Sequence, residues 1–217
     1  MKKLSGFITV FLLSSVLLAG CGSNSGSKTG TATTEGTASQ STQQTEVSKD
    51  TESADKPRIL VAYYSASGTT EKIADTIVEK LGADVFVIEP ADPYTDEDLN
   101  YRDDNSRVYK EHDNPDTRHV ELVTTDVEGF NSYDTIFIGY PIWWQSASWV
   151  VDDFVKNNDF TGKTVIPFCT SASSSIGESG NELAAMAGTG NWLKGERFSS
   201  QSTDEEIAEW LESVHLK

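Results

Sequence analysis

Residues 58–64 are Arg-Ile-Leu-Val-Ala-Tyr-Tyr, followed by Ser-Ala-Ser-Gly-Thr-Thr at 65–70 and Glu-Lys-Ile-Ala at 71–74. The first segment is β-branched and aromatic without polar alternation, which is typical of a strand buried on both faces of a parallel sheet. From Thr69 onward, apolar residues recur every four positions at Ile73, Ile77 and Leu81, which predicts a helix. The stretch therefore predicts a strand, a loop of small hydroxyl residues and a helix.

The loop places hydroxyl side chains around Gly68 at the expected helix N-terminus. They belong to Ser65, Ser67, Thr69 and Thr70. Free backbone N–H groups and the helix dipole favour an anion there, although such residues also commonly serve only as helix caps. The loop has no Lys or Arg and lacks the Gly-x-x-x-x-Gly-Lys-[Ser/Thr] pattern of nucleotide triphosphate sites. A single terminal phosphate is therefore the expected ligand group.

Residues 64–70 resemble the phosphate loop of the flavodoxin family, a Ser/Thr-x-Ser/Thr-Gly-x-Thr pattern after the first strand. The resemblance implies FMN as cofactor. It implies that the phosphate contacts come from Ser65, Ala66, Ser67, Gly68, Thr69 and Thr70. It also implies a ligand at the switch point of a doubly wound sheet, for which flavodoxin is an established example.

The 217 residues carry a formal net charge of -17 and two cysteines, enough for one domain with additional segments. Two lysines precede an apolar run at 7–18, and Leu-Ala-Gly-Cys at 18–21 resembles a bacterial lipobox. We expect a signal peptide at 1–20 and lipid on Cys21, which would anchor the protein to the bacterial cell membrane on its extracytoplasmic side. The alternative is an ordinary secreted protein.

Residues 21–56 form the expected tether, because Gly, Ser, Thr and Gln dominate and almost no large apolar side chain is present. The folded domain is then expected at 57–217. Its single cysteine, Cys169, lies in an apolar strand segment and is expected in the core. No intramolecular disulfide is expected in the mature domain.

After a predicted second strand at 83–88, an acidic insertion occupies about 91–128, with twelve acidic and four basic residues. The acidic spacing does not match an EF-hand, and the three dispersed histidines do not match a zinc site, so we expect no metal. A helix near 100–111 and an extended segment near 119–124 are predicted. Three tyrosines of the insertion either cover the flavin or anchor the insertion to the domain: Tyr94, Tyr101 and Tyr109.

The next predicted strand, 135–140, leads into Pro141, Ile142, Trp143 and Trp144. At the carboxyl end of a parallel strand, the indoles either stack on a flat ligand ring or pack in the core; we favour the ligand. The segment also resembles the flavin loop of flavodoxin-like proteins, with Pro141 fixing the turn. Related chains often have Gly and Pro where this chain has Gln145 and Ser148, and Ser148 is expected to cap the following helix.

A strand is predicted at 164–170, although its Pro167 cannot donate to a ladder and suggests a bulge near the strand's end. The polar loop that follows resembles the one whose backbone contacts the flavin's polar edge in flavodoxins. By that resemblance, the contact residues are Thr170, Ser171, Ala172 and Ser173. The alternative is an ordinary strand-to-helix connection.

An edge strand is predicted at 192–198, and a final helix begins at Thr203 with a capping box to Glu206. Five strands with interleaved helices predict an α/β fold, a three-layer doubly wound parallel sheet, flavodoxin-like, in the order 2-1-3-4-5. The segments that a phospho-acceptor receiver, a low-molecular-weight phosphatase or a serine hydrolase would need are absent from the sequence.

The three polar and aromatic loops together predict an FMN-binding redox flavoprotein, in which electron transfer requires no side-chain acid or base. It would be an electron carrier or an FMN-dependent oxidoreductase linked to quinone or NAD(P)H. The expected partner is a redox protein or a small electron donor or acceptor, and no nucleic acid is expected. The alternative is a non-redox lipoprotein that uses the same fold to hold another ligand or partner.

Overall fold

The computed structural model describes residues 57–214 and residue 216. The expected signal peptide (1–20), the lipid site at Cys21 and the tether (21–56) lie outside the described residues. Within the described part, no helix combines the length and the apolar character that crossing a bilayer requires.

The first βαβ unit consists of β1 (Ile59–Tyr63), α1 (Thr69–Leu81) and β2 (Asp84–Val87). Gly82 ends α1 in the left-handed conformation at φ 61°, and its N–H donates to the Val78 carbonyl at 2.8 Å. Glycine adopts this conformation without a Cβ penalty. β1 and β2 pair in parallel. The predicted strand, helix and strand are confirmed, with boundaries that agree to within one residue.

The remaining strands extend the sheet in the order β2-β1-β3-β5-β6. β3 (Thr135–Trp143) and β5 (Thr164–Thr170) lie in the middle, and β6 (Asn191–Trp192) and β7 (Glu196–Phe198) both pair with β5 in parallel. A two-residue strand, β4 (Ser146–Ala147), pairs antiparallel with the end of β3. The predicted order is confirmed, with the fifth strand split into β6 and β7.

Pro167 in β5 explains why the fifth strand is split into β6 and β7. The Val165 carbonyl accepts from Leu193 N–H at 2.8 Å, and Ser171 N–H donates to the Phe198 carbonyl at 3.1 Å. Backbone groups of alternate residues face the same neighbour, so the N–H that Pro167 lacks would have faced the fifth strand. A Cβ on Gly195 would lie 2.2 Å from the Pro167 carbonyl oxygen. The interruption therefore lies in the fifth strand, and the predicted bulge in the fourth strand is wrong.

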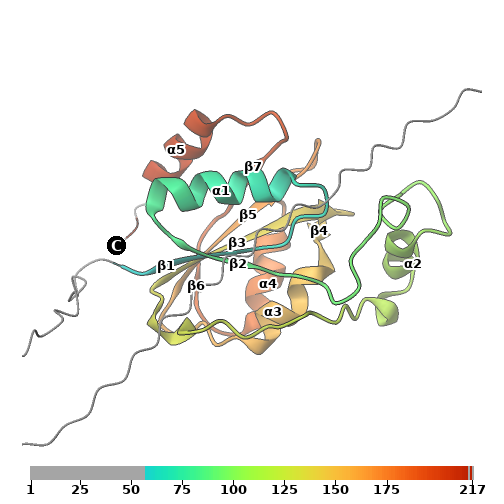
Figure 1. Ribbon diagram of the computed structural model, residues 1–217, viewed down its shortest axis with the longest axis horizontal. Coiled ribbons are helices and arrows are strands. Elements are labelled where there is room, and N and C mark those ends of the chain that lie inside the picture. Colours follow the sequence, from blue (N-terminus) through green and yellow to red (C-terminus); the bar gives the residue numbers. More distant parts are fainter. Residues whose placement is uncertain (1–56, 215, 217) are drawn as a thin grey trace, which may run out of the picture. The chain divides into compact units, whose positions relative to one another are not determined.

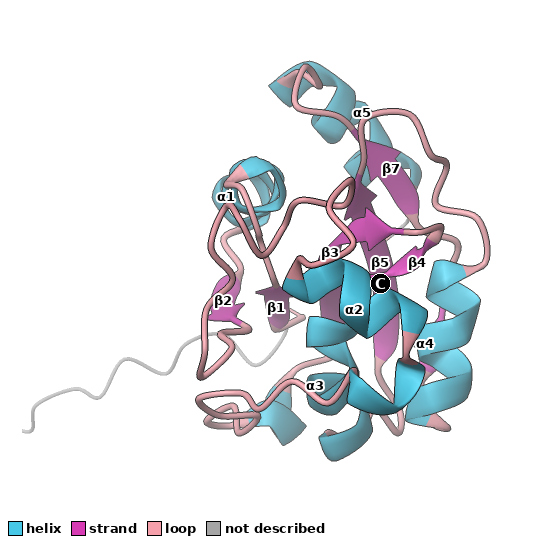
Figure 2. Cartoon of the chain, turned by 90° about the vertical axis from the view of Figure 1, so that its right-hand side faces the viewer, coloured by secondary structure: helices cyan, strands magenta, loops and turns pink. Residues whose placement is uncertain are grey.

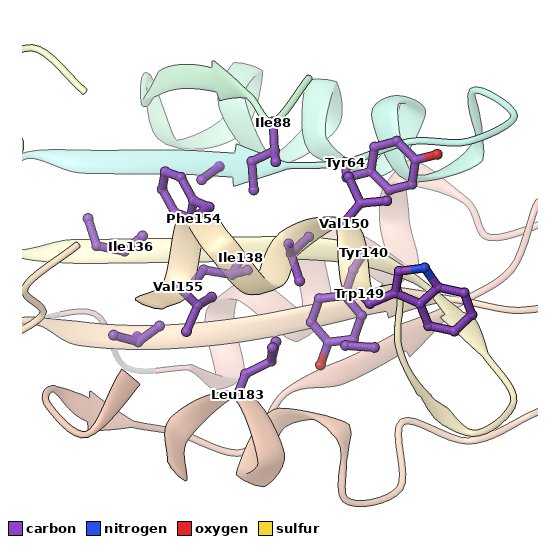
Figure 3. Packing of buried hydrophobic residues seen from close by; sticks show 14 of the residues in the cluster. Tyr64, Ile88, Ile136, Ile138, Tyr140, Trp149, Val150, Phe154, Val155 and Leu183 are labelled. Atoms are coloured by element: carbon purple, nitrogen blue, oxygen red, sulfur yellow. The ribbon is translucent and has the colours of Figure 1, made fainter. Parts of the chain in front are cut away.

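Helices cover both faces of the sheet (Figures 1 and 2). α1 and α5 (Asp204–Ser213) lie on one face, where their apolar side chains join Val61, Phe137 and Phe168. The 3-10 turn η3 (Trp149–Val151), α3 (Asp152–Asn157) and α4 (Ser179–Ala187) lie on the other. Figure 3 shows the second layer, with residues of β3 beside those of η3 and α3. The result is the predicted three-layer sandwich.

Two of the predicted helix caps have different outcomes. At α5, Thr203 N–H donates to the Glu206 carboxylate at 3.1 Å and Glu206 N–H donates to Thr203 Oγ1 at 3.3 Å, so the capping box is confirmed. Ser148 precedes η3, but its fully buried Oγ has no partner within the described residues and makes no cap. The Ser148 prediction is wrong because its backbone carbonyl, not its hydroxyl, accepts from Val151 N–H at 3.2 Å.

The acidic insertion contains the short helix α2 (Arg107–Asp113), followed by the 3-10 turn η1 (Pro115–Thr117); η2 (Phe130–Ser132) leads into β3. The helix predicted near 100–111 begins later, because Asp and Asn side chains upstream bond the local backbone, as in Asn105 N–H to Asp103 Oδ1 at 2.9 Å. The extended segment predicted near 119–124 is present as one antiparallel bridge between Pro90 and Leu122. The insertion therefore pairs with the chain that leaves β2.

Candidate functional site

The loop after β1 enters α1 without a side-chain cap. Gly68 is the N-cap residue at φ 81°, and no side chain makes a capping hydrogen bond there. The alternative in which the hydroxyl residues serve only as caps is therefore wrong. The first-turn N–H groups and the positive end of the helix dipole remain available to an anion at this position.

The loop hydroxyls differ in their surroundings. Ser65 Oγ is buried and has no hydrogen-bond partner within the described residues. Thr70 Oγ1 and Thr170 Oγ1 lie 2.8 Å apart in a buried hydrogen bond, which joins the loop after β1 to the end of β5. A buried polar group left without a partner costs about 1–3 kcal/mol. Ser65 is therefore a polar group whose partner a bound phosphate would supply.

Side-chain charge at this loop is negative. The Oε2 atom of Glu71 lies 4.0 Å from the position that a Cβ on Gly68 would occupy, and residues 65–70 include no Lys or Arg. Burial raises the pKa of Tyr63 below the loop, and the charges of Glu71 and Asp75 raise it further. Attraction for an anion therefore comes from the backbone at the helix end, against an opposing carboxylate.

A cavity of about 410 Å³ opens beside the same loop. Ser65 and Ala66 line one side, and Pro93 and Tyr94 from the start of the insertion line another. The insertion thus contributes to the wall next to the phosphate loop. The sequence did not predict this contact, because Tyr94 was one of three tyrosines expected either to cover the flavin or to anchor the insertion.

The paired tryptophans lie on a hairpin. β3 continues through Pro141 and Ile142 to Trp143, which pairs with Ser146 of β4, so the prediction that Pro141 fixes the turn is wrong. The turn residues are Trp144 and Gln145, with φ 45° and 71°. Positive φ at both positions is the signature of a type I′ turn, for which glycine and asparagine are preferred. The Gly expected in related chains at position 145 fits this backbone.

Trp143 is half-buried among three other rings. Its ring centroid lies 4.8 Å from that of Trp149, 5.3 Å from that of Tyr94 and 6.0 Å from that of Tyr64, all in edge-to-face geometry. Such arrangements stabilise aromatic pairs. Trp143 therefore joins the end of β3 to the residue after β1, to η3 and to the insertion.

Trp144 stacks on a histidine. The rings of Trp144 and His112 are 4.2 Å apart at 8°, and Tyr109, one turn earlier on α2, meets Trp144 edge-on at 6.3 Å. The sequence analysis gave His112 no role. Its spacing of three residues from Tyr109 places both side chains on one side of a helix, and this spacing is the sequence feature from which a shared contact could have been predicted. One face of the Trp144 indole is thus covered by α2.

The loop after β5 is held by an arginine that the sequence analysis did not identify. Arg197 of β7 donates to Ser171 Oγ at 2.9 Å and to the Ser171 carbonyl at 2.6 Å. Ser171 Oγ also contacts the Ser174 carbonyl, whereas Ala172 and Ser173 are exposed. The backbone of Ser171 is therefore committed to the fold, and of the four predicted contact residues only Ala172 and Ser173 are exposed.

Among the residues that the structure describes, the buried cysteine and the acidic and histidine side chains form no further site. Cys169 is fully buried, and burial raises the pKa of its thiol to about 12, so it is a core residue as predicted. In the range 57–214 and at 216, no group of three or more His, Cys, Asp or Glu side chains is arranged to hold a metal ion.

The three loops that follow β1, β3 and β5 lie at the carboxyl edge of a doubly wound parallel sheet, where such folds bind ligands. The geometry thus defines an α/β ligand-binding domain with a polar loop at a helix N-terminus and aromatic rings beside it. The model of the flavodoxin family matches residues 58–214. The chain belongs to the flavodoxin family.

Solved structures agree with this assignment. A protein assigned as a flavoprotein from Bacteroides eggerthii is 37% identical, with a TM-score of 0.67, over 74% of this chain and 99% of that one. One from Bacteroides uniformis is 37% identical, with a TM-score of 0.66, over 72% and 98%. A flavoprotein from Lactobacillus acidophilus in complex with FMN is 24% identical, with a TM-score of 0.53, over 71% and 99%. No curated protein sequence matched.

Proposed function

We propose that this protein is an FMN-binding redox flavoprotein. The observation that carries the proposal is the uncapped N-terminus of α1 with the buried, unpartnered Ser65 Oγ beside it. This is a site for one phosphate, at the sheet edge where an aromatic hairpin also ends. The Lactobacillus acidophilus flavoprotein, which shares the fold, is in complex with FMN.

In this proposal each loop has a separate task. Residues 65–70 hold the phosphate through backbone N–H groups and hydroxyls. The hairpin residues 141–144 supply apolar ring contacts, and residues 170–173 supply backbone hydrogen bonds from their exposed part. Bound FMN would supply reversible electron transfer, so the protein has to bind, orient and shield the cofactor and needs no side-chain acid or base.

The acidic balance of the chain favours a low reduction potential. The sequence carries a formal net charge of -17, and reduced flavin tends to be an anion, which negative surroundings disfavour. We expect the second one-electron potential of the bound cofactor to lie below that of free FMN. A redox titration that placed it at or above the free value would contradict this electrostatic argument.

The redox domain would act outside the cytoplasm. Lipid on Cys21 would anchor it to the membrane, and the tether at 21–56 would give it reach. The electron partner would be a protein or a small donor or acceptor. Whether the domain is a carrier or a quinone- or NAD(P)H-linked oxidoreductase depends on which of these partners oxidises or reduces it.

The test is a titration of the full chain, purified in mild detergent, with FMN and then with dithionite. Binding with a perturbed visible flavin band, followed by reversible bleaching, is the expected result. No binding at micromolar FMN would overturn the proposal. It would favour the alternative of a non-redox lipoprotein, whose loops hold another ligand.

A further inference from the structure

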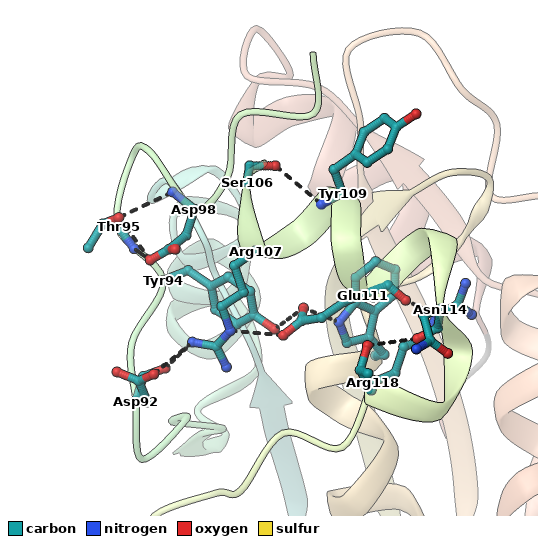
Figure 4. A network of polar contacts seen from close by, with 12 residues as sticks. Asp92, Tyr94, Thr95, Asp98, Ser106, Arg107, Tyr109, Glu111, Asn114 and Arg118 are labelled. Atoms are coloured by element: carbon teal, nitrogen blue, oxygen red, sulfur yellow. Dashed lines mark hydrogen bonds and ion pairs between the residues drawn. The ribbon is translucent and has the colours of Figure 1, made fainter. Parts of the chain in front are cut away.

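A buried carboxylate lies behind the aromatic hairpin. Glu111 on α2 is 7% exposed although it belongs to the most acidic segment of the chain. Its Oε2 accepts from Tyr94 Oη at 2.7 Å and from Trp149 Nε1 at 2.8 Å, and its Oε1 accepts from Arg107 Nε at 2.8 Å. Figure 4 shows the carboxylate beside the stacked Tyr94 and Arg107. Three donors from three segments therefore meet at one side chain.

Two arginines reinforce this arrangement. The Arg107 guanidinium lies 4.0 Å from the centre of the Tyr94 ring, and that of Arg118 lies 4.9 Å from the Trp149 ring. Arg118 also donates to the Glu111 carbonyl at 2.8 Å. Buried charges are retained when they are paired and hydrogen-bonded. Arg107 thus compensates the Glu111 carboxylate and stacks on Tyr94, whereas Arg118 binds the Glu111 backbone and stacks on Trp149.

The two rings held by Glu111 are those that contact Trp143 most closely. Trp149 approaches it to 4.8 Å and Tyr94 to 5.3 Å. Tyr94 also lines the cavity beside Ser65, and Trp149 lies 6.2 Å from Trp144 at 24°. Both tryptophans of the hairpin therefore pack against a ring whose position is held by a hydrogen bond to the Glu111 carboxylate.

We infer that Glu111 is a positioning residue for the flavin ring: by fixing Tyr94 and Trp149 it holds Trp143 and Trp144 in the geometry that contacts the ring. The inference rests on the proposed function. It assigns a binding role to the acidic insertion. The buried carboxylate of the insertion would position the rings that contact the flavin ring, while the loop after β1 would bind the phosphate.

The variant that tests this is Glu111→Gln. It keeps the size of the side chain but replaces one oxygen by an NH₂ group, which can only donate. Whichever oxygen is replaced, at least one of the donors Arg107, Tyr94 or Trp149 loses its acceptor in a buried place. Asp92→Asn is the matched control: it removes the same charge from the same network, where Asp92 Oδ2 contacts Arg107 Nη1 at 3.2 Å, but its side chain is 90% exposed.

The full chain in detergent would be titrated with FMN and with riboflavin, which has the same ring and lacks the phosphate. For Glu111→Gln we expect the dissociation constants of both flavins to rise about tenfold, with their ratio unchanged and the visible band of the bound flavin shifted. For Asp92→Asn, the dissociation constants of both flavins should stay within about twofold of those of the native protein. A purely structural role for Glu111 would lower the free energy of unfolding and leave the affinity of the folded protein unchanged.

Native affinity for both flavins and a native flavin band in Glu111→Gln would overturn the inference. Should that variant fail to fold, Tyr94→Phe tests the same contact, because it removes one donor to the carboxylate and keeps the ring. For Tyr94→Phe, the dissociation constants of both flavins are expected to rise about threefold. Unchanged dissociation constants would overturn the inference. Absence of FMN binding in the native chain would overturn the proposed function itself, and with it the role of Glu111.

Discussion

The two sides of the proposed site are built in different ways. The phosphate side, residues 65–70 and the start of α1, is contiguous in sequence and relies on backbone groups and one buried hydroxyl. The aromatic side brings together rings from the end of β1, the insertion, the β3–β4 hairpin and η3 around Trp143. Two of these rings, Tyr94 and Trp149, donate to the buried Glu111 carboxylate. Since phosphate and ring would be bound by separate parts, their contributions to affinity are separable by mutation.

The largest effect is expected on the aromatic side, from Trp143→Ala. Trp143 contacts three rings and is half-buried, so its loss should lower the free energy of unfolding by about 2–3 kcal/mol. The affinities for FMN and riboflavin should both fall by about tenfold or more. Urea unfolding and flavin titration measure the two effects. Trp192→Ala, another half-buried tryptophan, packed on Phe160, should destabilise without changing the flavin affinity of the folded chain.

Unchanged flavin affinity in Trp143→Ala would place the ring contact elsewhere. Trp144→Ala would then identify whether the hairpin contacts the ring at all. Because His112 already covers one face of Trp144, this second variant separates a ligand-stacking role from packing against α2.

The phosphate side was largely predictable from sequence because its determinants are local. A run of buried residues, a helical period and one glycine are enough to define β1, the loop and α1, and each lies within about twenty residues of the others. What remained hidden was the state of each hydroxyl. Thr70 is bonded to a residue one hundred positions away, and no local pattern distinguishes it from the unpartnered Ser65.

The aromatic side was only partly predictable, for the same reason. The two tryptophans stand out in the sequence, but the rings around them come from distant segments. Trp144 and Gln145 adopt positive φ without the Gly or Asn that usually signals such a turn. Glu111 is one of twelve acidic residues in the insertion. Glu111 is buried because of tertiary contacts with Tyr94 and Trp149, and these cannot be predicted from the spacing of charges.

The next largest effect is expected on the phosphate side, from Ser65→Ala. Its hydroxyl is buried without a partner, so removing it should leave the stability of the flavin-free chain unchanged or raise it by up to about 1 kcal/mol. Affinity for FMN should fall about tenfold, since hydrogen bonds to charged groups are worth roughly 1.5–3 kcal/mol. Affinity for riboflavin should not change. Calorimetric titration of both flavins checks these effects.

Ser148→Ala is the matched control, because the Ser148 Oγ is also buried without a partner within the described residues but lies before η3, outside residues 65–70, so the FMN affinity should not change. An equal loss of FMN and riboflavin affinity in Ser65→Ala would show that the two sides of the site are not separable there.

A smaller effect on stability is expected from Gln145→Gly in the hairpin. The φ of 71° costs a residue with a Cβ about 1–2 kcal/mol, which glycine avoids at some cost in chain entropy. A net stabilisation of about 1 kcal/mol is expected from chemical unfolding. Gln145→Ala should give no such gain. Equal stability of the two variants would mean that the turn is held without strain at this residue.

The smallest effect is expected from Glu71→Gln, which removes the carboxylate nearest to Gly68. Repulsion between this exposed charge and a bound phosphate is partly screened by water, so FMN affinity should rise only about threefold. The gain should shrink at about 0.5 M salt, where the screening length is short, and riboflavin affinity should stay unchanged. Glu79→Gln makes the same change in charge near the other end of α1 and should have no effect. A similar gain in Glu79→Gln would mean that the net charge of the domain opposes the phosphate, and a gain in riboflavin affinity would place Glu71 near the ring.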